Sequence, residues 1–361
     1  MEQIKKNAVV RDSNIELLRI LAILGVIVLH YNNANMGGGL KYVPVGSLKY
    51  YLLYLLETIF ICGVNVFVLI SGYFMSASQK RSIVKPLQLL IQVIVFNVLI
   101  SAIGWITHHT FSIKNLISAL IPVNYFVILY IALYFVSPYI NVALTTVSQK
   151  SLKYMVVICF CIFSIWPTIV DTVQHIAQTE YKGLSTIGMY GSQWGYSIVN
   201  FMLMYMIGGY IRVKELKNEN KQTGFSVLKL LVVLFFVVAL ILIWSLWNTS
   251  TAWEYCNPLV ILESVIIFLL FKKINFKSRI INSLSKATFT TFLAHTFFFR
   301  WLHIAEFVNK NALVMLAHIF VSCIAIYIVC YFIWLLYDVI TKPIYRFLFK
   351  NVKSYTVDLE D

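Results

Sequence analysis

Residues 14–33, NIELLRILAILGVIVLHYNN, decide the fold, because about twenty mostly apolar residues make a helix long enough to cross a bilayer. Of the 361 residues, 60% are hydrophobic and 12% charged, and the mean hydropathy is +0.80. This composition excludes a water-soluble globule and a disordered chain. The sequence predicts an all-α polytopic integral membrane helical bundle, a single domain over residues 1–361. About ten transmembrane helices are expected, near residues 14–33, 50–76, 86–107, 121–146, 154–173, 194–211, 225–247, 255–271, 288–307 and 312–340.

The basic residues are divided unequally between the two faces of this bundle. The chain has 29 Lys and Arg against 15 Asp and Glu, a net charge of +14. Counted from a cytoplasmic N terminus, 22 of the basic residues fall on the inner tails and connections, whereas the outer face has five: Lys41, Lys49, Lys114, Lys182 and Lys310. Positive residues accumulate on the cytoplasmic side of membrane proteins, so both termini are expected in the cytoplasm, with the chain in the cell membrane. The positive charge then reflects orientation in the lipid bilayer, and no nucleic-acid partner is expected.

Two ionisable side chains in the first span indicate a polar interior. Arg19 and His30 are eleven residues apart, which places them on one helical face about 16 Å apart along the axis. An ionised group at mid-bilayer costs about 2.5–3.5 kcal/mol on insertion, so it usually faces a partner or a water-filled cavity. Glu16, three residues before Arg19, is placed to pair with it. An equally supported alternative is that Arg19 extends to the cytoplasmic headgroups and His30 marks the outer interface.

Later spans contain further ionisable residues. His295 falls in the ninth span, where a core histidine bonded to a neighbouring helix is at least as well supported as a catalytic or gating role. Arg300 is expected in a structural ion pair with Glu57 or Glu263, and the sequence does not choose between these two glutamates. The six cysteines form no CxxC pair and no cluster at zinc-ligand spacing, so no metal is expected.

Several motifs follow one another from the first span to the ninth. The first pairs an Arg with a His, in NIELLRILA at 14–22 and VLHY at 28–31. The others are GVNVFVLISGYF at 63–74, NYFVILY at 124–130 with SPYIN at 137–141, YMIGGYIR at 205–212 and FLAH at 292–295. In this order, over nearly the whole chain, the set resembles the acyltransferase 3 family, the integral-membrane O-acyltransferases of bacterial cell-surface glycans.

The resemblance implies a reaction and a set of residue roles. It implies acetyl-CoA, or another acyl-CoA, as the cytoplasmic donor, and a hydroxyl of a cell-envelope polysaccharide or lipid-linked glycan as the acceptor. Arg19 would hold the donor, assisted by Lys80 and Arg81, because a guanidinium forks onto phosphate oxygens. His30 would be the general base on the acceptor hydroxyl, or alternatively would form a covalent acyl-histidine.

The resemblance also adds supporting residues and partners. Glu16, Ser71, Tyr125 and His295 are candidates for supporting or acceptor-site roles, and membrane proteins of polysaccharide biosynthesis are candidate partners. The chain departs from the family pattern at two places. Lys80, Arg81 and Lys85 stand where many members have Arg-x-x-Arg, and Tyr125 stands where many have Trp.

Two other classes of function remain open at this stage. A transporter or flippase of the envelope polysaccharide pathway would also have buried charges and a cavity near the membrane midplane. Such a carrier usually shows paired halves with interrupted helices at corresponding positions, and the sequence shows no such pairing. A noncatalytic membrane partner of a glycan polymerase is the third class, and in that case Arg19 and His30 would be individually dispensable.

Overall fold

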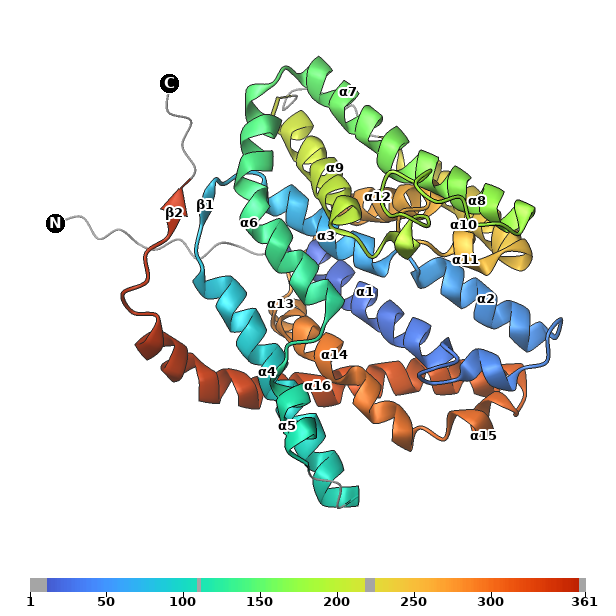
Figure 1. The fold of residues 1–361 in the computed structure, drawn as a ribbon. Coiled ribbons are helices and arrows are strands. Elements are labelled where there is room, and N and C mark those ends of the chain that lie inside the picture. Colours follow the sequence, from blue (N-terminus) through green and yellow to red (C-terminus); the bar gives the residue numbers. More distant parts are fainter. Residues whose placement is uncertain (1–11, 109–111, 218–224, 357–361) are drawn as a thin grey trace.

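The computed structural model describes residues 12–108, 112–217 and 225–356, which form a bundle of helices with one short pair of strands (Figure 1). The expected all-α polytopic membrane bundle is therefore confirmed. Lys5, Lys6, Arg11 and Lys221, which contribute to the predicted charge asymmetry, lie outside the described residues.

Many short helical pieces join the long helices. In chain order the elements are α1 (Ser13–Asn32), η1 (Gly39–Tyr42), α2 (Leu48–Phe60), α3 (Gly63–Met75), β1 (Lys80–Arg81), α4 (Val84–His108), α5 (Ile113–Leu120), α6 (Tyr125–Thr146), α7 (Gln149–Phe160), η2 (Cys161–Ile165), α8 (Trp166–Ala177), η3 (Gln193–Gly195), α9 (Ile198–Lys217), α10 (Val227–Trp247), α11 (Thr249–Ala252), α12 (Pro258–Lys273), α13 (Arg279–Leu284), η4 (Ser285–Ala287), α14 (Thr288–Ala294), η5 (His295–Trp301), α15 (Ile304–Val308), α16 (Ala312–Leu348) and β2 (Tyr355–Thr356).

Seven helical stretches of the described chain are long and apolar enough to cross a membrane: Ser13–Asn32, Leu48–Met75, Val84–Thr107, Ile113–Thr146, Gln149–Ala177, Val227–Trp247 and Ala312–Leu348. The other three predicted spans also fall on helices. However, α9 has Arg212, Lys214 and Glu215 near its end, α12 has only 16 residues, and the ninth span is divided among α14, η5 and α15. Length, charge and interruption therefore separate these three segments from the other seven.

Polar caps fix where several helices begin. Asn124 Oδ1 accepts the backbone N–H of Val127 at the start of α6, and Asn311 Oδ1 accepts that of Val314 at the start of α16. These side chains satisfy backbone donors that a helix start leaves without intrahelical partners. Pro258 is the first residue of α12, where its missing N–H is not needed.

The centre of the bundle is the close packing of α3 against α9. A Cβ atom added at Gly72 would collide with the backbone of Tyr205, and one added at Gly208 would collide with the backbone of Leu69. Glycine at these facing positions therefore lets the two backbones touch, as the Gly208-Gly209 pair in the sequence suggests. This contact fixes α3, and the large fully buried side chains Phe201 and Tyr205 lie around it.

The ninth predicted span is interrupted at His295. The α-helix α14 ends at Ala294, and the tighter 3-10 segment η5 begins at His295. The local sequence TFTTFLAHTFFFRW is rich in threonine and aromatic residues, which favour an α-helix weakly. Helix α14 packs against α1 and α16, so the interruption lies beside α1.

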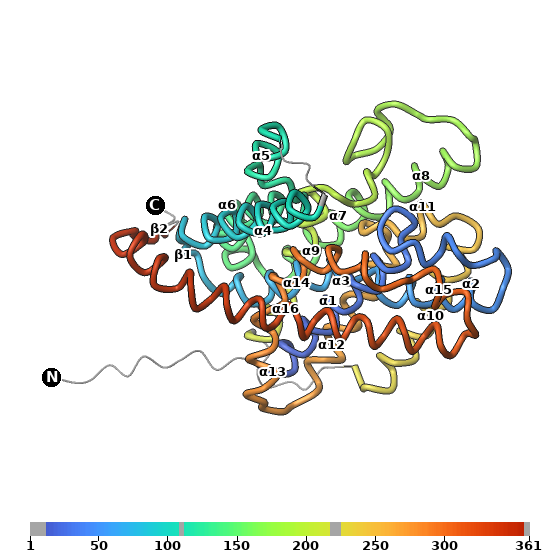
Figure 2. Tube along the Cα trace, turned by 90° about the horizontal axis from the view of Figure 1, so that it is seen from below, coloured from blue at the N-terminus to red at the C-terminus, as the bar shows by residue number. Residues whose placement is uncertain are grey.

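The two ends of the bundle differ in charge. Helix α1 begins and α16 ends at the same end, where β1 pairs with β2 in antiparallel register (Figure 1). Figure 2 shows α16 running along one side of the bundle from α15 to this strand pair, while α5 projects away from the rest. Lys80, Arg81, Lys85, Lys342 and Arg346 lie at this end, which we call the basic end. The other end holds α8, α11 and α15 and is called the opposite end.

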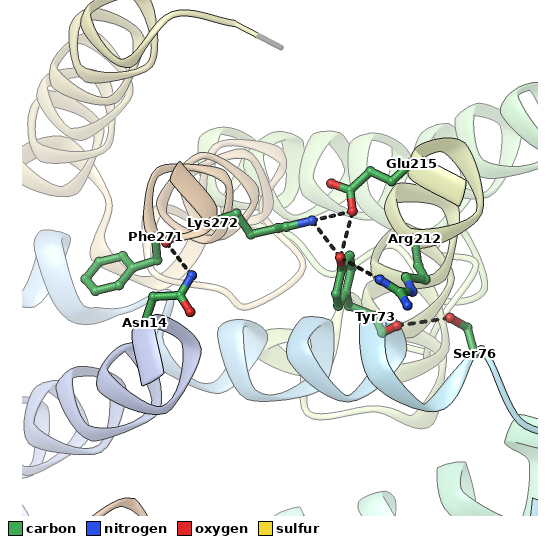
Figure 3. Close-up of polar contacts among 7 residues, drawn as sticks. All are labelled: Asn14, Tyr73, Ser76, Arg212, Glu215, Phe271 and Lys272. Atoms are coloured by element: carbon green, nitrogen blue, oxygen red, sulfur yellow. Dashed lines mark hydrogen bonds and ion pairs between the residues drawn. The ribbon is translucent and has the colours of Figure 1, made fainter. Parts of the chain in front are cut away.

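A charged cluster at the basic end joins three helices (Figure 3). Tyr73 of α3 donates its hydroxyl proton to Glu215 Oε2 of α9 at 2.6 Å. Lys272 of α12 donates to the same tyrosine oxygen at 2.6 Å and forms an ion pair with Glu215, and Arg212 donates to that oxygen at 3.1 Å. Both cations also lie over the Tyr73 ring. We call these four residues the Tyr73 cluster.

Candidate active site

The site is built around two imidazole rings from helices far apart in the sequence. His30 lies in the last turn of α1, and His295 lies at the interruption between α14 and η5. His30 Nδ1 and His295 Nε2 are 2.5 Å apart, and the two ring planes are nearly parallel, 11° apart, with centroids separated by 4.8 Å. His295 is 2% exposed and His30 is half-buried. We call these residues the histidine pair.

The partners of the two rings define where their protons lie. His295 Nδ1 is 2.9 Å from the backbone carbonyl oxygen of Thr291, which can only accept, so Nδ1 must carry the proton. In a neutral ring, His295 Nε2 then has a lone pair and accepts the Nδ1 proton of His30. The remaining nitrogen, His30 Nε2, therefore has a free lone pair. It makes no hydrogen bond with any residue in the described part of the chain.

Arg19 lies on the same helix, in a cavity nearer the basic end. Its side chain is 32% exposed, and Nη1 is 3.4 Å from Glu16 Oε1, so the expected ion pair is formed. The cavity has a volume of about 310 Å³, and its lining includes Arg19, Ser71, Tyr130 and Lys286. We call it the inner cavity. It holds two cationic side chains and four hydroxyl groups, those of Ser71, Tyr130, Ser285 and Thr288, in an otherwise apolar wall.

Aromatic rings separate the inner cavity from the histidine pair. Phe126 and Phe292 both line the cavity, with ring centroids 5.1 Å apart. The Phe292 ring is in turn 6.4 Å from the His295 ring. Val26, another lining residue, is one helical turn before His30, which corresponds to about 6 Å along the axis. The cavity thus reaches to within one turn of the histidine pair, whose rings lie beyond its aromatic wall.

Arg81, expected among the donor-binding residues, is committed to contacts within the protein. It is 4% exposed, and all five of its N–H groups donate to neutral oxygens: Ser137 Oγ, Tyr205 Oη and the carbonyls of Met75, Ser78 and Lys80. These contacts fix the turn after α3. Lys80 is adjacent in β1 and exposed, and neither residue lines the inner cavity.

The opposite end supplies a second polar setting near α1. The carboxyl group of Glu57, which is 7% exposed, lies beside the side chain of Asn32, two residues after His30. Tyrosine and tryptophan rings surround this region in contacting pairs: Tyr54 with Trp253, Tyr125 with Tyr196, and Tyr196 with Tyr255. The candidate residue Tyr125 therefore belongs to an aromatic group at the opposite end and not to the inner cavity.

The predicted ion pairs of Arg300 are not formed among the described residues. Arg300 is exposed and its guanidinium lies over the rings of Phe297 and Trp301. Glu263 is fully buried beside Cys62, away from any cation of the described chain. Glu57 and Glu263 are buried, as expected for ionisable residues in the spans, but helix packing brings neither of them to Arg300.

Two contributors to the site were not expected from the sequence. The Thr291 carbonyl sets the proton position on His295, and Lys286 brings a second cation to the inner cavity. Lys286 is recognisable in the sequence only as one of many inner-face charges. The Thr291 carbonyl has one available signal, because it lies one helical turn before His295. The part of the chain that the structure describes contains no group of three or more metal-ligating side chains.

These features define a class: a multi-pass membrane protein with a cavity that holds cationic and hydroxyl groups, next to a hydrogen-bonded pair of imidazole rings. The comparison with family models identifies the class further. The model described as "Acyltransferase domain", of the acyltransferase 3 family, matches residues 12–335. The chain therefore belongs to the acyltransferase 3 family and is a membrane acyltransferase. The comparison with curated proteins finds no match, and neither does the comparison with solved structures.

Proposed function

We propose that the protein is an O-acetyltransferase that moves an acetyl group from cytoplasmic acetyl-CoA to a hydroxyl group of a cell-envelope polysaccharide or lipid-linked glycan. The observation that carries this proposal is the directed hydrogen-bond chain from His30 through His295 to the Thr291 carbonyl. It leaves one basic nitrogen free, next to a cavity with cationic and hydroxyl groups. An acyl transfer to a hydroxyl needs a base of this kind.

In the proposed reaction, His30 Nε2 takes the proton from the acceptor hydroxyl while the hydroxyl oxygen attacks the thioester carbonyl carbon. The carbon–sulfur bond then breaks, and the leaving thiolate takes the proton back from Nε2. During this step the imidazolium of His30 keeps donating from Nδ1 to His295 Nε2. A hydrogen bond of this kind orients the base and stabilises its charged form, as the third member of a catalytic triad does. His295 is therefore a positioning residue.

The donor is proposed to enter from the basic end, which we assign to the cytoplasm. Positively charged residues favour that side of a membrane protein, and the start of α4 and the end of α16 follow the pattern. Arg19 lies in the inner cavity between that end and His30, with Glu16 holding part of its guanidinium. The other N–H groups of Arg19 are available to bind oxygen atoms of the acyl donor.

The acceptor is proposed to approach from the opposite end. The aromatic group around Glu57, with Tyr54, Trp253 and Tyr196, combines flat apolar surfaces with a buried carboxyl group. Sugar rings have apolar faces and hydroxyl edges, so this combination suits a carbohydrate better than a purely apolar substrate. The donor and the acceptor would then meet at His30 from two sides.

The test uses membranes and cells carrying the intact protein, His30→Ala, Arg19→Ala or the matched control His175→Ala. His175 is an imidazole at the opposite end that contacts Trp247 and lies outside the inner cavity. Membranes are given acetyl-CoA labelled in the acetyl group, and label is counted in the lipid and glycan fractions. Proton NMR of the surface polysaccharide measures ester-linked acetyl. The proposal is supported if label and acetyl ester are lost in His30→Ala and Arg19→Ala but not in His175→Ala, with normal glycan export in all of them.

Two outcomes contradict it or change its chemistry. If acetyl ester persists in His30→Ala while glycan export stops, the protein is a glycan carrier. If labelled acetyl-CoA without acceptor leaves a covalent acetyl group on His30, the lone pair of Nε2 acts as nucleophile and not as base. Mass spectrometry of the peptide containing His30 distinguishes these two uses of the same nitrogen.

A further inference from the structure

A second cavity at the basic end has a role that the proposed reaction leaves unexplained. It lies between α4, α6 and α16 and has a volume of about 560 Å³. Three cationic side chains line it, Lys85, Lys342 and Arg346, against one acidic side chain, Asp338. None of these four forms a hydrogen bond or ion pair with another described residue. We call this cavity the basic groove.

Flat aromatic rings stand next to these charges. Trp334, Tyr134, Tyr337 and Tyr345 line the basic groove, and the hydroxyls of Tyr337 and Tyr345 are hydrogen-bonded at 2.6 Å. Lys286 from the inner cavity lies over the Trp334 ring. Unpaired cations recognise phosphate oxygens, and aromatic rings stack on a nucleobase. The volume is also within the usual range of small-molecule sites.

The basic groove and the inner cavity are neighbours. Leu89 of α4 and Tyr130 of α6 line both of them. A ligand with a phosphorylated nucleotide at one end and a thin arm at the other would occupy both cavities by passing Leu89 and Tyr130. Its arm would pass Arg19 and lead towards the aromatic wall in front of the histidine pair.

We propose that the basic groove binds the adenosine phosphate head of the acyl donor. Lys342 and Arg346, one helical turn apart on α16, bind the phosphates, and Trp334 stacks on the base. This inference rests on the proposed function for the identity of the donor. It assigns the phosphates to α16 because Arg81, in the connection between α3 and α4, donates all of its N–H groups to the protein itself.

An anionic lipid headgroup is the other phosphate source at this position. The aromatic rings and the shared wall with the inner cavity favour the nucleotide, because a headgroup uses neither. The test therefore measures both ligands. Purified full-length protein is placed in nanodiscs of neutral lipid, and binding of adenosine 3′,5′-bisphosphate is measured by calorimetry. The measurement is repeated in nanodiscs that contain phosphatidylglycerol.

The variants are Lys342→Gln/Arg346→Gln, the control Lys350→Gln and Asp338→Asn. The double variant should bind the nucleotide about a hundredfold more weakly, because a hydrogen bond to a charged group contributes about one order of magnitude and two are lost. Lys350 is exposed on the same end and lies outside the groove, so Lys350→Gln should bind normally. Asp338→Asn removes the one negative charge and should tighten binding by a few fold. Misfolding cannot produce such a gain.

The outcomes are separable from those of the proposed function. His30→Ala should bind the bisphosphate as tightly as the intact protein, since His30 lies outside the basic groove. Nucleotide binding without any acyl transfer would sink the proposed function and leave this site standing. The inference is overturned if the double variant binds like the intact protein, or if the nucleotide fails to bind in neutral lipid. Displacement of bound nucleotide by phosphatidylglycerol would instead assign the groove to the lipid.

Discussion

The histidine pair and the Tyr73 cluster both join distant helices through short polar contacts, but they differ in what they leave unsatisfied. In the Tyr73 cluster, Glu215 lies between a tyrosine hydroxyl and a lysine, and the tyrosine oxygen accepts from two cations. Each polar side chain of this cluster therefore bonds to another member of the same cluster. In the histidine pair every hydrogen bond points the same way, from His30 to His295 to a backbone carbonyl, and the chain starts from a free lone pair.

This difference predicts two kinds of response to substitution. A closed network of opposite charges contributes to stability, and losing one member leaves the others without their partners. An open chain that starts from a free acceptor contributes little to stability through that acceptor, but the acceptor can take a proton. Substitutions in the Tyr73 cluster should therefore change the unfolding temperature, and substitutions in the histidine pair should change turnover.

The largest effect is expected for His30→Asn. The Asn amide nitrogen falls near the position of His30 Nδ1 and can still donate to His295, but the basic nitrogen is lost. Since general base catalysis contributes about 10²–10⁴-fold, kcat should fall by about that factor while the unfolding temperature stays unchanged. Acyl transfer by purified protein and a thermal unfolding scan check this. Activity within tenfold of the intact protein would remove His30 as the base.

The next effect is smaller, and it tests whether His295 positions His30 or only fills space. His295→Leu removes the acceptor for His30 Nδ1, whereas His295→Gln restores an acceptor oxygen close to Nε2. We expect kcat to fall by about 10–100-fold in the leucine variant, with KM for the donor unchanged, and to recover in part in the glutamine variant. Equal activity of the two variants would mean that His295 only fills space.

The local half of this site follows from the sequence and the distant half does not. The pairing of Glu16 with Arg19 depends on two residues three positions apart on one helix, and it forms as helical spacing predicts. The close packing at Gly208 is also readable, because small residues allow backbones to touch. The all-α membrane fold depends on the length and apolarity of each segment, and it is likewise readable.

Contacts between distant helices depend on rotations and depths that no single helix specifies. His30 and His295 are 265 positions apart, and their contact requires α14 to end where η5 begins. Arg300 is expected to meet a buried glutamate, but the turn of η5 directs it to the surface. In the sequence, Lys342 and Arg346 contribute only to the prediction of how the chain is oriented in the membrane. The groove that they line exists because α16 packs beside α4 and α6.

The Tyr73 cluster gives the matching test on stability. Glu215→Gln keeps the hydrogen-bond acceptor for Tyr73 but leaves Lys272 and Arg212 without the negative charge between them. Glu215 is 41% exposed at its side chain, so solvent screens part of this effect, and we expect a loss of about 1 kcal/mol, or about 2–4 °C in the unfolding midpoint. Turnover should stay within about twofold. A larger loss of turnover than of stability would contradict the assignment of this cluster to structure.

The smallest effect concerns a carboxyl group at the opposite end of the bundle, which lies beside another acid and not beside cations. Glu254, in the connection between α11 and α12, is 3% exposed. Burial, and then the neighbouring Asp171, raise the pKa of Glu254 well above its ordinary value of 4.5. The folded protein therefore keeps a proton that the unfolded chain releases above about pH 4.5, so this group makes the fold less stable as the pH rises towards the raised pKa. Glu254→Gln stays neutral at every pH.

The variant should therefore lose less stability than the intact protein between pH 5 and pH 8. The expected difference is a smaller fall of the unfolding midpoint of Glu254→Gln over this pH range. Thermal unfolding in detergent at both pH values measures it, with Glu215→Gln as the comparison, because that carboxyl lies beside cations and Glu254 lies beside another acid. If Glu254→Gln leaves the pH dependence unchanged, the carboxyl of Glu254 is ionised in the fold, and a buried acid there must be matched by a cation that approaches it.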